Sequence, residues 1–128
     1  MILDSSAIIA ILVEEPGWEV LFGRLTDASF RGVGAPTLLE TGIVLSSKLD
    51  SSSIGLLSRF AGELEIATVH FGEDHWREAL DAFHRFGKGR HPARLNLGEC
   101  MTYAVAKLSG EPLLCMGDDF PQTDLVIA

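Results

Sequence analysis

MILDSSAIIAIL, residues 1–12, decides how the chain begins its fold. Met1–Leu3 is a short apolar run that predicts a buried strand. Asp4 follows it directly, and Ser5 or Ser6 is suited to cap the helix that the next apolar residues predict. The stretch has no basic leading region and carries an acid before its apolar run, which argues against a signal peptide. A strand, an acid and a helix therefore form the first unit.

Short apolar runs alternate with longer amphipathic segments along the rest of the chain. The predicted strands are residues 1–3, 32–35, 66–69, 113–116 and 125–127. The predicted helices are about 5–13, 18–28, 37–49, 54–64, 73–86 and 97–108. Between them we expect a turn and cap at 50–53, a helix C-cap at Gly87 and a polar loop at 87–94. This alternation favours an α/β sandwich with helices flanking a short, mostly parallel sheet.

Length and composition set the broad class of protein. A chain of 128 residues with 47% apolar content suggests a single domain, 1–128, with a sizeable core. No window of uninterrupted apolar residues is long enough for a membrane span. Cys100 and Cys115 lack a CxxC partner and lie in apolar segments. They are interpreted as small core residues of a cytoplasmic protein, not as a disulfide or a zinc site.

Several acidic residues next to apolar runs have no cationic neighbour at helical spacing. Asp4 ends the first strand, and Asp118 and Asp119 follow the fourth. In a parallel α/β sheet, ligands bind beyond the carboxyl ends of the strands. Glu40 and Glu99 lie near helix starts, which face the same end. We therefore expect separate segments to bring acids to one edge of the sheet.

Each acid also has a purely structural explanation. Asp4 suits a helix N-cap, and Asp118 or Asp119 suits a turn. Glu99 lies three residues after Asn96, which is the spacing of a capping box, and meets the positive end of the helix dipole. Glu40 is harder to explain in this way, because a half-buried carboxylate costs free energy unless it is paired. These explanations account for each residue singly, but not for their convergence.

Clustered carboxylates repel one another, and a hard divalent cation relieves that repulsion. A set of oxygen ligands without His or Cys points to Mg²⁺, with Mn²⁺ possible, and away from zinc. The usual chemistry of such a site is phosphoryl transfer. A phosphatase that begins with Asp-x-Asp fits less well, since the sequence here is Asp4-Ser5-Ser6. The chain also lacks a GxxxxGK[ST] loop and a GxSxG elbow.

Three stretches together resemble a known family over essentially the whole chain: MILDSSAIIAIL, APTLLETGIVL and GKGRHPARLNLGECMTYAVAKLSGEPLLCMGDDFPQTDL. They are similar to PIN-domain ribonucleases and, more narrowly, to the VapC toxins of bacterial toxin–antitoxin pairs. The resemblance implies a PIN-like α/β/α sandwich and a Mg²⁺-dependent endoribonuclease that cleaves RNA. It also implies a homodimer in the cytoplasm and a cognate VapB-type antitoxin that neutralises the toxin.

The resemblance also implies roles for individual acids. The family's acidic quartet falls on Asp4, Glu40, Glu99 and the acid after the fourth strand, where Asp119 matches better and Asp118 stays open. Asp4 and Glu99 would bind the metal directly, and Asp119 would bind it directly or through water. Glu40 would orient or deprotonate the attacking water. The family usually has Asp at the third position, so the longer Glu99 puts catalytic efficiency in doubt.

Two further features accompany the quartet. Ser6 is expected to hydrogen-bond near the metal, or else simply to cap its helix. The loop 87–94 carries Lys88, Arg90 and Arg94, which are candidates for contacts with RNA phosphates despite the formal net charge of −8. A solvated loop without function is the alternative. Phe71 and Trp76 are interpreted as core residues, not base-stacking platforms.

Apolar stripes at 18–25 and 54–64 are suited to a homodimer interface, an antitoxin groove or ordinary core packing. Two rival functions remain open. One is a metal-dependent phosphatase that acts on small phosphates. The other is a catalytically impaired PIN domain, disabled by Glu99, that binds RNA or a partner without cutting. Cleavage of RNA, cleavage of a phosphomonoester, or RNA binding without cleavage would separate the three.

Overall fold

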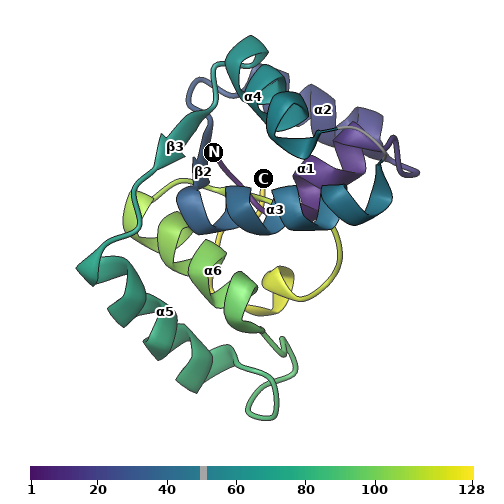
Figure 1. The fold of residues 1–128 in the computed structure, drawn as a ribbon. Coiled ribbons are helices and arrows are strands. Elements are labelled where there is room, and N and C mark those ends of the chain that lie inside the picture. The colour runs from purple at the N-terminus through teal and green to yellow at the C-terminus, as the bar shows by residue number, and fades with distance from the viewer. Residues whose placement is uncertain (50–51) are drawn as a thin grey trace.

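The computed structural model describes residues 1–49 and 52–128 (Figure 1). Its elements, in chain order, are β1 Ile2–Leu3, α1 Ser5–Leu12, α2 Trp18–Asp27, β2 Gly32–Gly34, α3 Ala35–Lys48, α4 Ser53–Glu63, β3 Ala67–Val69, α5 Glu73–Phe86, α6 Leu97–Ser109, β4 Leu113–Leu114 and the short 3₁₀ helix η1 Phe120–Gln122. Asp50 and Ser51, half of the expected turn before α4, lie outside the described residues. Ser52 caps α4 by accepting a hydrogen bond from the backbone N–H of Gly55.

The described strands form one parallel sheet in the order β3-β2-β1-β4. Ile2 and Leu3 of the central strand are fully buried, as expected for a strand covered on both faces. The predicted α/β architecture is confirmed. Because the strands are parallel, the carboxyl ends of β1, β2 and β4 meet at one edge, where Asp4 follows β1 and α3 begins directly after β2.

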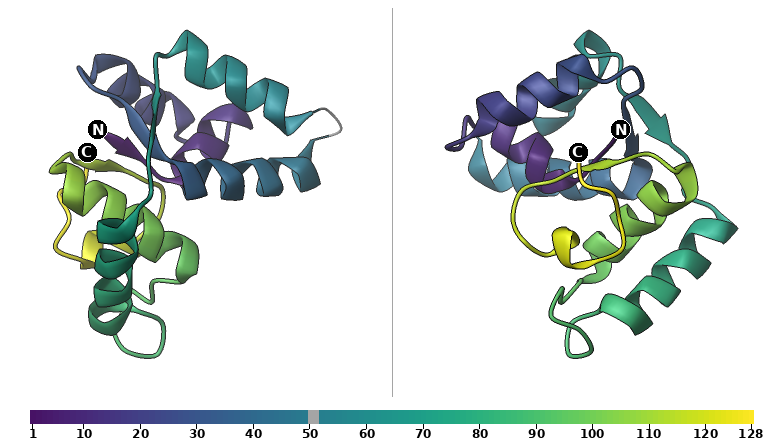
Figure 2. Two further views of the ribbon diagram at one scale, coloured as in Figure 1. Left: turned by 60° about the vertical axis from the view of Figure 1, so that its left-hand side comes forward. Right: turned by 180° about the vertical axis from the view of Figure 1, so that it is seen from behind.

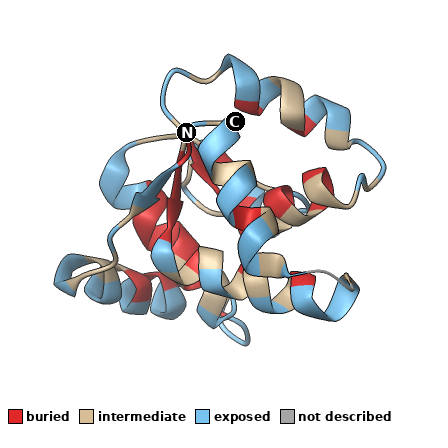
Figure 3. Cartoon of the chain, turned by 45° about the horizontal axis from the view of Figure 1, so that its top comes forward, coloured by how far each residue is buried: buried red, intermediate tan, exposed pale blue. Residues whose placement is uncertain are grey.

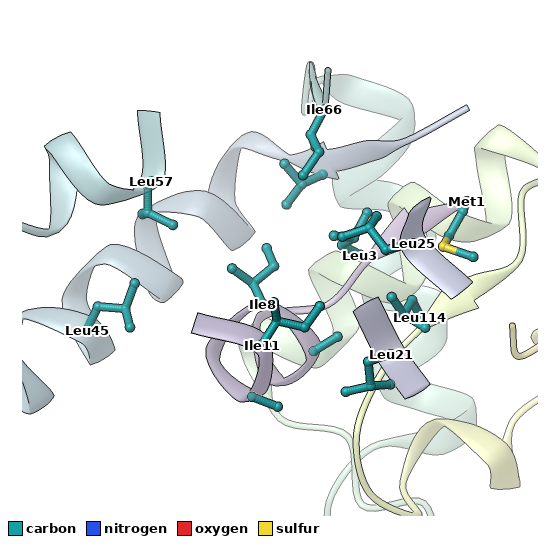
Figure 4. Close-up of a cluster of buried hydrophobic side chains, with 13 residues drawn as sticks. Met1, Leu3, Ile8, Ile11, Leu21, Leu25, Leu45, Leu57, Ile66 and Leu114 are labelled. Carbon is teal, nitrogen blue, oxygen red and sulfur yellow. The ribbon is translucent and has the colours of Figure 1, made fainter. Parts of the chain in front are cut away.

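Two apolar clusters cover the two faces of the sheet. The first gathers α1, α2 and α4 around buried side chains that include Leu3, Ile8 and Leu25 (Figure 4). The second packs α5 and α6 against the other face, with Tyr103 and Leu113 fully buried. Figure 3 shows buried positions concentrated in the strands and in the helices next to them, while the outer helix faces are exposed.

Helix α6 links the layers. Its Thr102 hydroxyl lies 2.9 Å from that of Thr37 in α3, and both side chains are buried. Helix α5 packs mainly on α6 and lies on the outside of the molecule, away from α1, α2 and α4 (Figure 2). The chain between α5 and α6 forms the loop that carries the basic residues.

Several predicted elements differ in detail. The expected strand at 125–127 is a single bridge, in which Ile127 pairs with Leu113. The strand predicted at 113–116 ends at Leu114, because the chain then turns away toward the acidic edge. Of the predicted caps of α1, the structure has Asp4 and not Ser5 or Ser6, with the Asp4 carboxylate accepting from the backbone N–H of Ser6. The side chain is therefore a cap and a site residue together.

The placement of one aromatic side chain was predicted wrongly. Trp76 is 48% exposed, whereas Phe71 packs against the second cluster as expected. The cause is tertiary: α5 packs mainly on α6, so part of its apolar stripe stays uncovered. Cys100 and Cys115 are free, as predicted. None of the helices in the described part of the chain is long and apolar enough to cross a membrane.

Candidate active site

Asp4 occupies the centre of the acidic edge. It leaves the central strand, and its backbone N–H donates to the carbonyl of Leu114 in β4 at 2.9 Å. Only 5% of Asp4 is exposed. Its Oδ2 accepts two hydrogen bonds from Ser6, one from the backbone N–H at 3.0 Å and one from the hydroxyl at 2.6 Å. The Ser6 hydroxyl in turn accepts from the backbone N–H of Met116 at 3.0 Å.

Glu40 reaches the same edge from the second turn of α3. Its Oε1 accepts a 3.3 Å hydrogen bond from the hydroxyl of Ser5. Its carboxyl group also lies directly against the backbone of Gly98 in α6: a Cβ built at residue 98 would stand 2.9 Å from Glu40 Cδ and closer still to Oε2. Glu40 is thus enclosed by α1 on one side and by the first turn of α6 on the other.

Glu99 enters from α6 through the expected capping box. Asn96 Oδ1 accepts from the backbone N–H of Glu99 at 2.9 Å, and Glu99 Oε2 accepts from the backbone N–H of Asn96 at 2.8 Å. One carboxylate oxygen therefore serves the cap and leaves Oε1 for another ligand. The hydrogen bond of the capping box therefore does not use Oε1.

Asp119, and not Asp118, shares a hollow with Glu99. A polar cavity of about 250 Å³ is lined by Lys88, Arg94, Asn96, Glu99 and Asp119. Asp118 and Asp119 are both exposed, but Asp118 does not line this cavity, and its backbone carbonyl accepts from the Gln122 side chain at 2.9 Å. The geometry thus brings Asp119, and not Asp118, to Glu99.

The segment after Asp119 is pinned to α6 by a polar network. Asp124 accepts from the Tyr103 hydroxyl at 2.6 Å, from Lys107 Nζ at 2.8 Å and from Arg85 at 3.1 Å. Burial alone would raise the pKa of Asp124, but these donors hold that pKa well below its usual range. Phe120, directly after Asp119, is 3% exposed. These two anchors fix the backbone that carries Asp119.

The acids influence one another electrostatically. Burial raises the pKa of Glu40, and the charge of Asp4 raises it further, while the Ser5 hydrogen bond opposes the shift. Burial also raises the pKa of Glu99, the backbone N–H of Asn96 opposes this, and Asp119 and Asp4 add to it. Asp4 therefore lies within electrostatic reach of two other acids, Glu40 and Glu99.

No three His, Cys, Asp or Glu side chains within residues 1–49 and 52–128 stand close enough together to hold a metal ion as arranged. Each of three acids instead accepts a hydrogen bond from a donor close to it: Asp4 from Ser6, Glu40 from Ser5 and Glu99 from Asn96. Mutual repulsion explains this spread. The donor set still fits a hard divalent cation, since it is made of carboxylate oxygens, which are the ligands that such a cation prefers.

Two of the three predicted RNA-contacting cations lie at the acidic site, and the third lies beside it. Lys88 and Arg94 line the polar cavity with Glu99 and Asp119. Arg90 borders only the neighbouring hollow of the loop, and its guanidinium stacks 5.3 Å from the centre of the Phe83 ring. None of the ion pairs among the described residues involves these three side chains. Lys88 and Arg94 therefore lie at the Glu99 and Asp119 side of the acidic site without an ion-pair partner among the described residues.

Sequence reasoning missed two contributors. Gly98 was not singled out, although the glycine just before Glu99 signals a place where another group approaches the backbone. Ser5 was considered only as a cap, yet it donates to Glu40 across 35 positions of the chain. That hydrogen bond has no sequence signal, because only the packing of α1 against α3 creates it.

Fold and site together define the class: an α/β protein with a cluster of carboxylates at the carboxyl ends of its parallel strands. Comparison with protein families makes this specific: the family model described as PIN domain matches residues 1–125. The chain belongs to the PIN domain family, and the predicted resemblance to its VapC branch is confirmed by its relatives.

Those relatives match over nearly the full length of both chains. Ribonuclease VapC of Mycolicibacterium smegmatis is 40% identical, covering 98% of this chain and 97% of the relative. Ribonuclease VapC36 of Mycobacterium tuberculosis is also 40% identical, with coverages of 98% and 91%. A VapC ribonuclease of Rhizobium meliloti is 42% identical, with coverages of 96% and 97%. The prediction of a ribonuclease agrees with the names of all three.

Solved structures support the fold. VapC20 of M. tuberculosis, described as a toxin that cleaves the sarcin–ricin loop, superposes with a TM-score of 0.78 at 15% identity, covering 99% of this chain and 97% of that one. A toxin–antitoxin complex from Klebsiella pneumoniae gives a TM-score of 0.72 at 14% identity, with coverages of 99% and 95%. At these identities the likeness shows the PIN architecture alone.

Proposed function

We propose that this protein is a Mg²⁺-dependent endoribonuclease toxin of the VapC type, acting in the cytoplasm as a single domain. The observation that carries the proposal is the polar cavity in which Glu99 and Asp119 face Lys88 and Arg94. Binding and hydrolysis of an RNA phosphodiester require both the cationic side and the acidic side of such a cavity. The cations attract the negatively charged phosphate, and the carboxylates would hold the divalent metal that promotes hydrolysis.

Asp4, Glu99 and Asp119 are the residues that would hold the metal. Mg²⁺ suits their oxygens, and Mn²⁺ is the closest substitute. When bound, the cation polarises the phosphate oxygens and lowers the pKa of a coordinated water. Glu99 keeps one oxygen on Asn96 and offers the other, so its extra methylene does not exclude it from the set.

Glu40 is the proposed general base. Burial and the neighbouring Asp4 raise the pKa of its carboxyl, which improves its ability to accept a proton from water. The Ser5 hydroxyl fixes the orientation of Oε1. Lys88 and Arg94 would bind the phosphates that flank the scissile bond, with Arg90 further along the strand.

A homodimer and a cognate antitoxin are proposed as partners. Large apolar side chains of α3, α4, α5 and α6 form one exposed apolar face: Leu39, Ile43, Ile54, Trp76, Leu80, Phe83 and Leu97. Three adjoining hollows of about 400, 440 and 240 Å³ connect them. A face of this extent is characteristic of a protein interface. The antitoxin would then occlude the acidic site with a chain that carries a basic residue.

The test is cleavage of a mixed pool of tRNA and ribosomal RNA by the purified protein with Mg²⁺, with Mn²⁺ and with EDTA. Discrete fragments that require both the metal and Asp4, and that an Asp4→Ala variant fails to produce, support the proposal. A generic phosphomonoester is assayed in parallel. Its turnover without RNA cleavage would support the phosphatase instead, and RNA binding without cleavage would support an impaired PIN domain.

A further inference from the structure

The first turn of α6 contacts two of the four site acids. Asn96 is bonded reciprocally to Glu99. Gly98, one residue before Glu99, provides the surface on which the Glu40 carboxyl rests. These contacts involve a backbone N–H and a bare Cα, so both acids are held by groups that do not themselves ionise.

With the Glu40 carboxyl in its present position, residue 98 has no room for a side chain, so a larger residue there would displace that carboxyl. A Cβ there would lie 2.9 Å from Glu40 Cδ, a separation that real Cβ atoms essentially never show. Gly98 has no positive φ angle that would otherwise demand glycine. The absence of a side chain at residue 98 therefore matters for the placement of the Glu40 carboxyl and not for the backbone of the helix.

The hydrogen bonds at Asn96 fix the direction of Glu99. A free glutamate has three side-chain torsions, and the bond from the backbone N–H of Asn96 to Glu99 Oε2 restricts them. The Asn96 side chain meanwhile holds the backbone of Glu99 in the first helical turn. The longer acid is thus pre-oriented in a way that a shorter aspartate at this position would not be.

We propose that Asn96 and Gly98 are positioning residues of the active site: Gly98 admits Glu40 to its place, and Asn96 orients Glu99 toward Asp4 and Asp119. The inference rests on the proposed function for its catalytic consequence, but its geometric content is independent of the substrate. Residues that hydrogen-bond to metal ligands and orient them commonly have a large effect on metal affinity and on the reaction rate.

The test for Gly98 is a double-mutant cycle with Glu40. Gly98→Ala should lower the RNA cleavage rate about 10- to 100-fold, because it misplaces Glu40. In a Glu40→Ala background the same change should have no further effect. Gly55→Ala, in the first turn of α4 where a Cβ meets open space, is the matched control. An equal loss in both backgrounds, or a rate within about twofold of the parent, would overturn the assignment.

The test for Asn96 is Mn²⁺ affinity, measured from the free-ion EPR signal. Asn96→Ala should weaken Mn²⁺ binding about 10-fold, and Asn96→Ser, which keeps a capping oxygen, should restore most of it. Unchanged affinity in Asn96→Ala, or an equal loss in both variants, would refute the role.

Failure of the proposed function can be distinguished from failure of this positioning role. If the parent does not cleave RNA, the Mn²⁺ measurement still judges Asn96. The side-chain carboxyl ¹³C resonance of Glu40 then judges Gly98: it should shift in Gly98→Ala and not in Gly55→Ala. An unmoved resonance would refute the positioning role of Gly98 whatever the substrate.

Discussion

The hydroxyl of Ser6 donates a 2.6 Å hydrogen bond to Oδ2 of Asp4. The same hydroxyl accepts from the backbone N–H of Met116, just beyond β4. Because Asp4 leaves β1 and Met116 leaves β4, this one side chain joins the ends of two adjacent strands where the acids gather. Ser6 is thus more than a helix cap, which was the alternative that the sequence left open.

Removal of this hydroxyl should loosen Asp4. We expect Ser6→Ala to lower the RNA cleavage rate about 10-fold and the free energy of unfolding by about 1 kcal/mol. Ser6→Thr keeps the hydroxyl and should stay near the parent in both. The measurements are single-turnover cleavage and urea unfolding. A parental rate in Ser6→Ala would show that the hydroxyl has no part in catalysis.

Shortening Glu99 tests the reciprocal cap. Glu99→Asp keeps the charge, but the shorter side chain no longer reaches the backbone N–H of Asn96. We expect a loss of about 0.5–1 kcal/mol in stability and weaker Mn²⁺ binding. If Glu99→Asp instead cleaves RNA faster than the parent, the longer acid is an impairment and the family's usual Asp is the better ligand.

Neutralising Glu40 should stabilise the protein at neutral pH. Its pKa in the folded protein lies above the ordinary value of 4.5, so the folded state binds this proton more tightly than the unfolded state. The ionised carboxylate therefore costs stability at neutral pH, and that cost disappears as the pH falls through the raised pKa.

We accordingly expect Glu40→Gln, in the absence of divalent metal, to raise the melting temperature by about 2–5 °C at neutral pH. The difference from the parent should shrink as the pH approaches 4.5. Thermal denaturation followed by circular dichroism across this range is the measurement. A gain that persists unchanged into acid would point to a cause other than ionisation.

Cations at the polar cavity should set the affinity for RNA. Lys88→Gln and Arg94→Gln are expected to weaken RNA binding in EDTA and to reduce the salt dependence of log K by about 0.7 for each phosphate that is no longer neutralised. Arg59→Gln, an exposed position in α4, is the control. Equal effects in all three variants would indicate a general influence of net charge and not a binding site.

The exposed apolar face should mediate self-association. Leu39 and Ile43 are 67% and 63% exposed, so replacing both with Glu should leave the monomer fold intact. We expect the parent to have twice the monomer mass by light scattering, and the Leu39→Glu, Ile43→Glu variant to be monomeric. Val20→Glu, at a 58% exposed position of α2, should remain dimeric. A monomeric parent, or a dimeric double variant, would place the interface elsewhere or exclude it.

Local patterns predicted most of the elements correctly. Helices α2, α5 and α6 follow the predicted ranges to within a residue or so, since each has an amphipathic stripe and a clear stop. The strand predicted at 125–127 is a single bridge, because a short apolar run does not reveal how many neighbours it will pair with. The prediction that Trp76 is a core residue was wrong for a similar reason. Periodicity shows which face of a helix is apolar, but not which other element packs on that face.

The sequence by itself determined the order of strands and helices, the capping box of Asn96 and Glu99, and the set of acids at the carboxyl edge. These depend on periodicity and on interactions between residues a few positions apart. Only the tertiary structure decided that Asp119 and not Asp118 faces Glu99, that Ser5 holds Glu40, and that Gly98 makes room for it. Such interactions join segments tens of residues apart, and their geometry exists only once the helices have packed on the sheet.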